Sequence, residues 1–177
     1  MIGFLRFVGV LNAAVWLGAA IFYTVGAGPV LTSQSMLAVL GARNFPYFSG
    51  AVAQLVLGSY FHLQLVCAVV ALLHLLAEWL YLGRPARKFW LGLLAGLFIL
   101  SAAGSFWLCP KLSRLHLTRY ALNVEPKERY AAARSFGLWS GVLQTVNVLL
   151  IGGAAVYLWR VANPADSLRF VSPAKFR

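Results

Sequence analysis

His74 and Glu78 are the two side chains of this sequence whose types and spacing best suit chemistry. They lie four residues apart in the apolar stretch LHLLAEWLYL, so on a helix both point to the same side. Ionisable groups inside a membrane helix are costly, and such pairs can relay protons or bind metal ions. In the simpler interpretation His74 donates a hydrogen bond to a neighbouring helix, and Glu78 pairs with the basic segment GRPARK that follows it. The basic residues of that segment are Arg84, Arg87 and Lys88.

A second polar group lies in the last long apolar run. Ser140, Gln144 and Asn147 fall within about 60° of one another on an ideal helix. They predict a polar stripe, for which Asn12 in the first apolar run is a possible counterpart. Hydrogen bonds between membrane helices contribute about 0.6 kcal/mol each and specify packing. The stripe is therefore interpreted either as a device that joins helices or as one wall of a substrate path.

The histidines do not favour haem. Bis-histidine ligation needs two histidines on facing helices at similar depth. His62 and His74 share one apolar run, and His116 follows Pro110, where we expect a loop. The two cysteines lie inside apolar runs without a CxxC spacing, and no GxSxG, HExxH or P-loop pattern occurs. We therefore expect a protein that is not an enzyme and has no cofactor.

The composition requires a bilayer around these residues. Of the 177 residues, 61% are hydrophobic and 11% are charged, and the mean hydropathy is +0.78. Soluble domains carry about 25% charged residues. The net charge of +11 comes from basic residues gathered between and after the apolar runs. That distribution predicts contacts of Arg84, Arg87 and Lys88 with anionic lipid head groups, not with nucleic acid.

The fold class that follows is an all-α, integral membrane four-helix bundle. A membrane-spanning helix needs about 20 apolar residues, and four stretches qualify. The predicted spans cover about 4–25, 55–82, 89–109 and 136–159. Short interfacial helices are expected in the first and third connections, and Pro110 is expected to stop the third span. We treat 1–161 as one membrane domain and 162–177 as a polar C-terminal tail.

Membrane sidedness follows from the basic residues. Four spans put both termini on one side, which carries eight basic residues against seven on the other. The short GRPARK connection favours termini in the cytoplasm, because positive charge in short connections is retained there. The expected location is the inner membrane of a bacterium.

Several stretches together resemble a known family. They are NFPYF (44–48), YFHLQLVCA (60–68), FWLCPKLSRL (106–115) and EPKERYAAARSFGLWSGVLQTVNVLL (125–150). Their order resembles the transmembrane protein 205-like family of small four-span proteins, whose bacterial members are catalogued as a domain of unknown function. The resemblance covers roughly residues 5–160. It implies the fold and a membrane location, but no established reaction.

The resemblance also ranks the candidate residues. His62 matches the family pattern, whereas Ser140 stands where the family usually has a histidine. By this resemblance the matched positions, His62 and Ser140 among them, would lie toward the membrane face opposite the termini. The resemblance therefore implies no metal or proton role for position 140 of this chain.

Two functions remain open. The first is a non-catalytic accessory subunit that packs against a larger membrane complex. The second is a small oligomeric transporter or binding protein for a metal ion or a hydrophobic solute. Its candidate site consists of His62, Tyr60, Ser140, Gln144 and Asn147. The partners expected in either case are anionic lipids, other membrane subunits or further copies of the chain.

Overall fold

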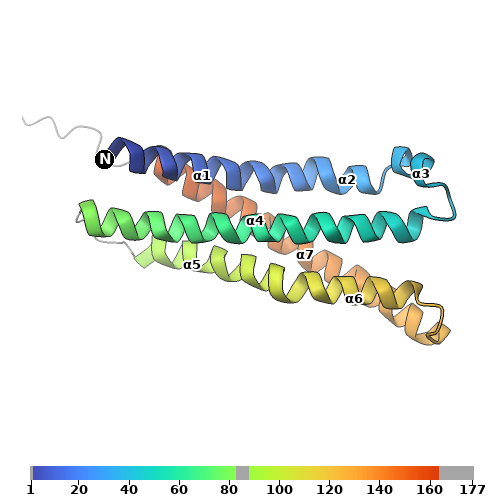
Figure 1. Cartoon of the computed structure of the whole chain (residues 1–177). Coiled ribbons are helices and arrows are strands. Elements are labelled where there is room, and N and C mark those ends of the chain that lie inside the picture. Colours follow the sequence, from blue (N-terminus) through green and yellow to red (C-terminus); the bar gives the residue numbers. More distant parts are fainter. Residues whose placement is uncertain (1, 83–87, 164–177) are drawn as a thin grey trace, which may run out of the picture.

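The computed structural model describes residues 2–82 and 88–163, and in this part the chain is helical (Figure 1). Four of its helices are long and apolar enough to cross a membrane, and they cover Gly3–Leu31, Phe45–Tyr81, Lys88–Tyr120 and Pro126–Ala162. The elements are α1 (Ile2–Phe22), η1 (Tyr23–Ala27), α2 (Gly28–Leu31), α3 (Gln34–Leu40), α4 (Phe45–Leu82), α5 (Lys88–Ala103), η2 (Gly104–Leu108), α6 (Cys109–Tyr120) and α7 (Pro126–Ala162). The all-α four-helix membrane bundle predicted from the sequence is confirmed.

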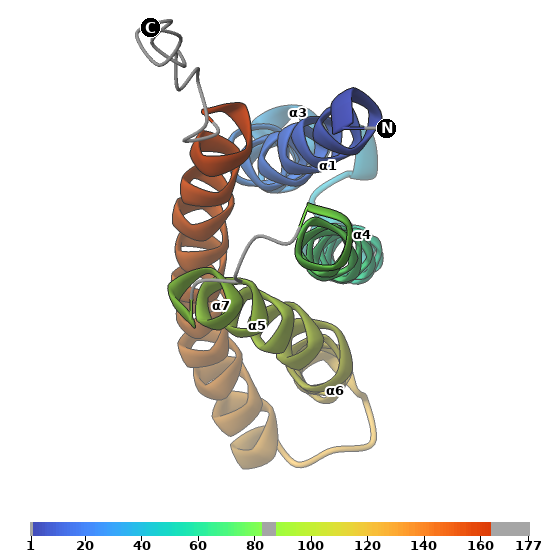
Figure 2. The ribbon, with the colours of Figure 1, turned by 90° about the vertical axis from the view of Figure 1, so that its left-hand side faces the viewer.

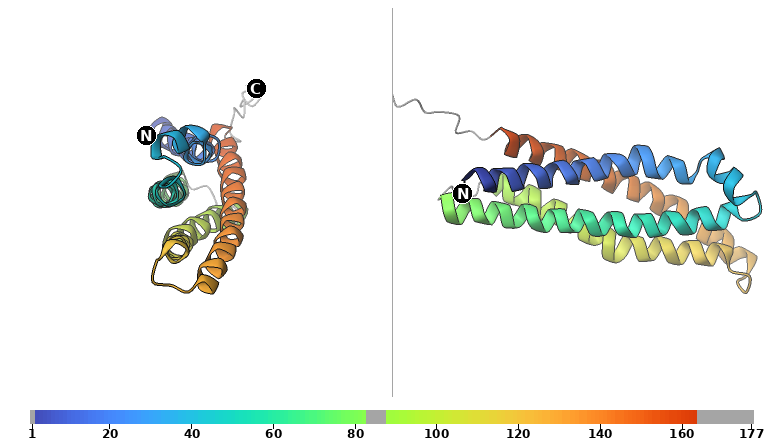
Figure 3. Two further views of the ribbon diagram at one scale, coloured as in Figure 1. Left: turned by 90° about the vertical axis from the view of Figure 1, so that its right-hand side faces the viewer. Right: turned by 45° about the horizontal axis from the view of Figure 1, so that its top comes forward.

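The four spans are antiparallel along the chain, and α7 leans across the other three. Figures 2 and 3 show α1, α4 and the α5–α6 helix in a row, with α7 running obliquely over one side of that row. Its C-terminal end packs on α1, where Arg6 Nη2 donates to the carbonyl of Ala162 at 3.0 Å. Its N-terminal part packs on α6, where the rings of Phe136 and His116 are 6.1 Å apart. As a result α7 contacts both edges of the row.

Each span is longer than the hydrocarbon layer requires. A helix of 37 residues, such as Phe45–Tyr81 or Pro126–Ala162, is about 56 Å long against a layer of about 30 Å. The ends therefore extend into the head-group zones, and these helices begin about ten residues before the predicted spans.

The first connection contains the predicted short helix, α3. Ser33 caps its N-terminus by accepting a hydrogen bond from the backbone N–H of Met36, and Gly41 ends it with a φ of 73°. In the third connection the predicted helix is the N-terminal part of α7 itself, with Pro126 at its first position.

Pro110 does not end the third span, contrary to the prediction. A proline inside an α-helix clashes with the carbonyl four residues earlier. Here the preceding turn, η2, is a wider π-helical turn, in which the Cys109 N–H bonds the carbonyl of Gly104. The same arrangement precedes Pro29, where η1 ends as the Gly28 N–H bonds the carbonyl of Tyr23. The wide turns make room for both prolines, so the helices continue.

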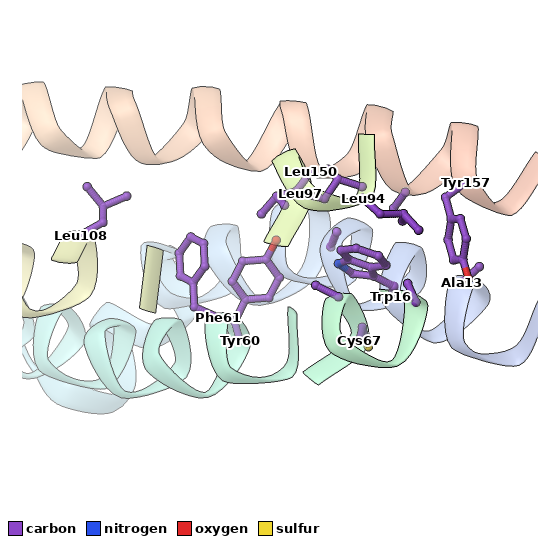
Figure 4. Packing of buried hydrophobic residues seen from close by; sticks show 14 of the residues in the cluster. Ala13, Trp16, Tyr60, Phe61, Cys67, Leu94, Leu97, Leu108, Leu150 and Tyr157 are labelled. Atoms are coloured by element: carbon purple, nitrogen blue, oxygen red, sulfur yellow. The ribbon is translucent and has the colours of Figure 1, made fainter. Parts of the chain in front are cut away.

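The interior of the bundle is packed with large side chains against small ones. Figure 4 shows Trp16, Phe61, Leu94, Leu97, Leu150 and Tyr157 in this core, and all are at most 3% exposed. Glycines lie against several of the buried rings and branched side chains. A Cβ atom at Gly9 would overlap His74, one at Gly104 would overlap Phe61, and one at Gly153 would overlap Leu97. Small residues at such points let membrane helices approach closely.

Candidate functional site

Glu78 and Arg160 form an ion pair near the end of the bundle where the N-terminus lies. Arg160 Nη2 is 2.6 Å from Glu78 Oε2, and the two side chains are 21% and 19% exposed. Arg160 is thus a partner of Glu78 that the sequence analysis did not predict. Arg84 and Arg87 lie outside the described residues, and Lys88 is exposed at the start of α5. The fourth span, α7, runs parallel to α4 and brings its last turn beside Glu78, which spacing along the sequence does not reveal.

His74 joins three helices one turn deeper in the bundle. Its Nε2 lies 3.0 Å from the carbonyl of Leu5, and its Nδ1 lies 3.4 Å from the hydroxyl of Tyr157. An Nε2–H donor and an Nδ1 acceptor satisfy both bonds with a neutral ring. His74 is 4% exposed, and the absence of a side chain at Gly9 makes room for its ring. This arrangement fits the structural interpretation of His74.

Asn147 is the centre of a second polar layer further along the bundle. Its Oδ1 accepts from the Tyr60 hydroxyl, and its Nδ2 donates to Thr24 Oγ1 at 2.5 Å. Thr24 in turn donates to the carbonyl of Ala20 at 2.8 Å. The ring of Tyr23 stacks on that of Tyr60, with centroids 4.4 Å apart. The layer connects η1, α4 and α7.

The rest of the predicted ligand site does not assemble in the structure. His62 is exposed, and its Nδ1 donates to the carbonyl of Gly58 at 2.8 Å within the same helix. Tyr60 precedes it by two residues, which on a helix is about 200° away, and therefore faces inward. Ser140 donates to the carbonyl of Phe136 in its own helix, and Gln144 is exposed. Of the five predicted residues, Tyr60 and Asn147 are brought together.

Asn12, the predicted counterpart of the polar stripe on α7, bonds another helix. Asn12 Nδ2 donates to the carbonyl of Cys67 on α4 at 3.0 Å, and not to α7. Asn12 reaches the carbonyl of Cys67 because α4 packs closely against α1. Asn12 thus holds α1 and α4 together.

Sequence reasoning missed a third polar layer at the far end of the bundle. His116 was expected in a loop, but it lies on α6 and is 4% exposed. Its Nε2 lies 3.1 Å from the carbonyl of Tyr47, and its ring stacks at 5.6 Å on the Tyr47 ring. Gly50 leaves the space that His116 occupies. The error followed from the prediction that Pro110 ends the helix.

Gln64 and Trp16 were also missed. Both are 0% exposed. Neither the amide of Gln64 nor the indole nitrogen of Trp16 has a hydrogen-bond partner among the residues that the structure describes. A glutamine one turn after Tyr60 in an apolar helix was the available signal. In residues 2–82 and 88–163 no group of three His, Cys, Asp or Glu side chains is arranged to hold a metal ion.

The Asn147 layer gives a first testable prediction. The change Tyr60→Phe removes one hydrogen bond between α4 and α7 and is expected to lower the free energy of unfolding by about 1 kcal/mol. Thermal unfolding in detergent measures this. Tyr130→Phe is the matched control, because Tyr130 is 79% exposed. An equal effect of both changes would show that the hydroxyl of Tyr60 contributes nothing specific.

The family match is to the domain described as Domain of unknown function (DUF4149), and it covers residues 11–121. This is more than half of the 177 residues. The matched region begins within α1 and ends directly after α6, so α7 lies beyond it. No curated protein and no solved structure matches the chain. The four apolar helices indicate an integral membrane protein, and the chain belongs to the DUF4149 family.

Proposed function

We propose that the protein is a non-catalytic accessory subunit that packs against a larger membrane protein. The observation that carries this proposal is the outer face of α7. Gln144 lies midway along this helix and is exposed. A polar amide at that depth faces hydrocarbon, where an unsatisfied polar group is costly. A neighbouring membrane helix that supplies a hydrogen bond would remove this cost.

Two glycines on the same face support a helix partner. Gly137 and Gly141 fall within about 60° of Gln144 on the helix. A Cβ at either glycine would meet no other atom of the described chain within 4 Å. Small residues four apart let a second helix approach closely, and a polar side chain beside them can bond across the contact. The partner is therefore expected to present a membrane helix with a polar side chain at mid-depth.

The bonding inside the bundle supports the non-catalytic part of the proposal. Glu78 is paired with Arg160, and His74 and His116 are each bonded to a backbone carbonyl of another helix. These groups hold the four spans together, and their bonding capacity is largely used in doing so. In the alternative, a small oligomeric transporter or binding protein, His62 and Tyr60 of one chain would not line the same pocket, because they face opposite ways.

The proposed location is the inner membrane of a bacterium, with cytoplasmic termini and anionic lipids at Arg84, Arg87 and Lys88. It is supported by the basic GRPARK connection. We also propose kinship with the transmembrane protein 205-like family. Its support is the order of the motifs NFPYF, YFHLQLVCA and FWLCPKLSRL.

The test is co-purification from native membranes in mild detergent, followed by mass spectrometry. We expect a larger membrane protein in stoichiometric amount. The change Gly141→Leu should reduce its recovery at least tenfold, because the leucine fills the space that a partner helix would use. Gly92→Leu is the matched control, since Gly92 has equally open surroundings on α5. A chain that purifies alone or with copies of itself would contradict the proposal, and equal losses in both variants would contradict the choice of face.

A further inference from the structure

Three polar side chains near the middle of the bundle hold buried atoms that no described residue bonds. They are the indole nitrogen of Trp16, both amide atoms of Gln64 and the hydroxyl of Ser105. Trp16 and Gln64 are 0% exposed, and Ser105 is 8% exposed. More than nine in ten buried polar groups in proteins have a hydrogen-bond partner. In hydrocarbon the lack of one is costlier still, because bulk water does not reach the group.

The register between α1 and α4 brings Trp16 and Gln64 to one level. Asn12 bonds the carbonyl of Cys67, and the ring of Tyr23 stacks on that of Tyr60. Because the two helices are antiparallel, Gln64 lies between these pairs at the level of Trp16. In Figure 4 the indole nitrogen of Trp16 is on the side of its ring toward Tyr60, which is one turn from Gln64.

The register between α4 and the third span brings Ser105 to the same region. Phe61 lies against Gly104, the residue that precedes Ser105, and Gln64 is about one turn from Phe61. Ser105 is part of η2, the wide turn before Pro110. Single π-helical turns of this kind occur often at functional sites. Three buried side chains with unbonded polar atoms thus lie at similar levels on three different helical elements.

The unbonded atoms of Trp16, Gln64 and Ser105 are suited to bind an uncharged molecule. Trp16 supplies one donor, Gln64 supplies two donors and an acceptor, and Ser105 supplies one donor and an acceptor. None of the three is charged, and the ion pair of Glu78 and Arg160 lies about 20 Å away along α4. A water molecule accepts and donates in the required combination, and buried waters commonly make about three such bonds.

We infer that α1, α4 and η2 enclose a bound-water site in the middle of the membrane, formed by Trp16, Gln64 and Ser105. The water accepts from Trp16 Nε1 and from the Gln64 amide nitrogen, and it donates to Gln64 Oε1 and to Ser105 Oγ. Because it lies between α1, α4 and η2, the water links these three elements by hydrogen bonds. This inference is independent of the accessory role proposed above, because it concerns the interior of a single chain.

The experiment is solid-state NMR of the protein in lipid vesicles, with nitrogen-15 in tryptophan and glutamine side chains. Magnetisation transferred from water is expected to reach the indole N–H of Trp16, identified by its loss in Trp16→Phe. The transfer should be comparable to that at Trp159, which is 73% exposed at the end of α7. No transfer to Trp16 in the unchanged protein would overturn the site.

Three variants test the role of Gln64 in binding the water. Gln64→Met keeps the shape of the side chain without its polar atoms and should reduce transfer to Trp16 at least threefold, while Trp159 is unaffected. Gln64→Asn keeps an amide and should retain most of the transfer, and Gln34→Met is the control, because Gln34 is exposed on α3. Unchanged transfer in Gln64→Met would overturn the assignment. A stoichiometric organic molecule in native mass spectra that is lost in Gln64→Met would also overturn it, because water would not be the occupant.

Discussion

Substitution of Gly104 by leucine is expected to lower the free energy of unfolding by about 3 kcal/mol, the upper part of the range for overpacked cores. A Cβ atom at this position would already overlap the ring of Phe61, which is 0% exposed. The ring cannot withdraw, because core side chains are close-packed. The fraction of protein that stays folded after heating in detergent, followed by size-exclusion chromatography, measures the effect.

Gly96→Leu is the control in the same span, because a Cβ at Gly96 meets no described atom within 4 Å. Both changes raise helix propensity by a similar amount, so their difference isolates the overlap. The double change Gly104→Leu with Phe61→Ala should recover part of the loss by removing the ring. If Gly104→Leu is as stable as Gly96→Leu, the close approach of α4 and η2 is not as described.

The change Glu78→Gln is expected to cost about 3 kcal/mol, because it leaves the guanidinium of Arg160 largely buried without its counter-charge. The estimate is at the lower end of the range for buried pairs, because both side chains keep about a fifth of their surface exposed. Urea or thermal unfolding of the reconstituted protein provides the measurement. The change Arg160→Gln should lower the free energy of unfolding by a similar amount, because it leaves the carboxylate of Glu78 without its partner.

The double variant separates the pair from its two members. With Glu78→Gln and Arg160→Gln together, no unpaired charge remains, so the loss should be clearly smaller than that of either single change. Additive losses would mean that the contact at 2.6 Å contributes no coupling. In that case Arg160 would be held by other groups, such as the ring of Trp90, which lies 5.1 Å from its guanidinium.

The fold could be predicted from the sequence more fully than the contacts of the candidate site, and the reasons are physical. The four spans were predictable because a run of about 20 apolar residues has few alternatives to a membrane helix. Asn147 and Tyr60 were predictable as buried polar groups, since each lies on an apolar helix. The partner of Glu78 was not, because Arg160 is 82 residues away in the sequence. Only the packing of α7 on the rest of the bundle brings the two together.

Local rules were also overridden by backbone geometry. Proline normally ends or kinks a helix, and that rule put His116 in a loop. The wide turn η2 accommodates Pro110 instead, so the helix continues and His116 is buried. His62 and Tyr60 were assigned to one candidate site because both lie near the same end of the second span and His62 matches the family pattern. Because residues two apart on a helix point to nearly opposite sides, Tyr60 faces the core and His62 does not.

The oblique course of α7 has a consequence for what counts as a domain in this family. The recognised region ends at residue 121, yet α7 supplies Asn147 to one polar layer, Tyr157 to the next and Arg160 to the ion pair. Without it the Tyr60 hydroxyl and the Glu78 carboxylate lose the partners they have in the bundle. We therefore expect the cooperative folding unit to be longer than the recognised region, with the unfolding of α7 coupled to that of the other three spans.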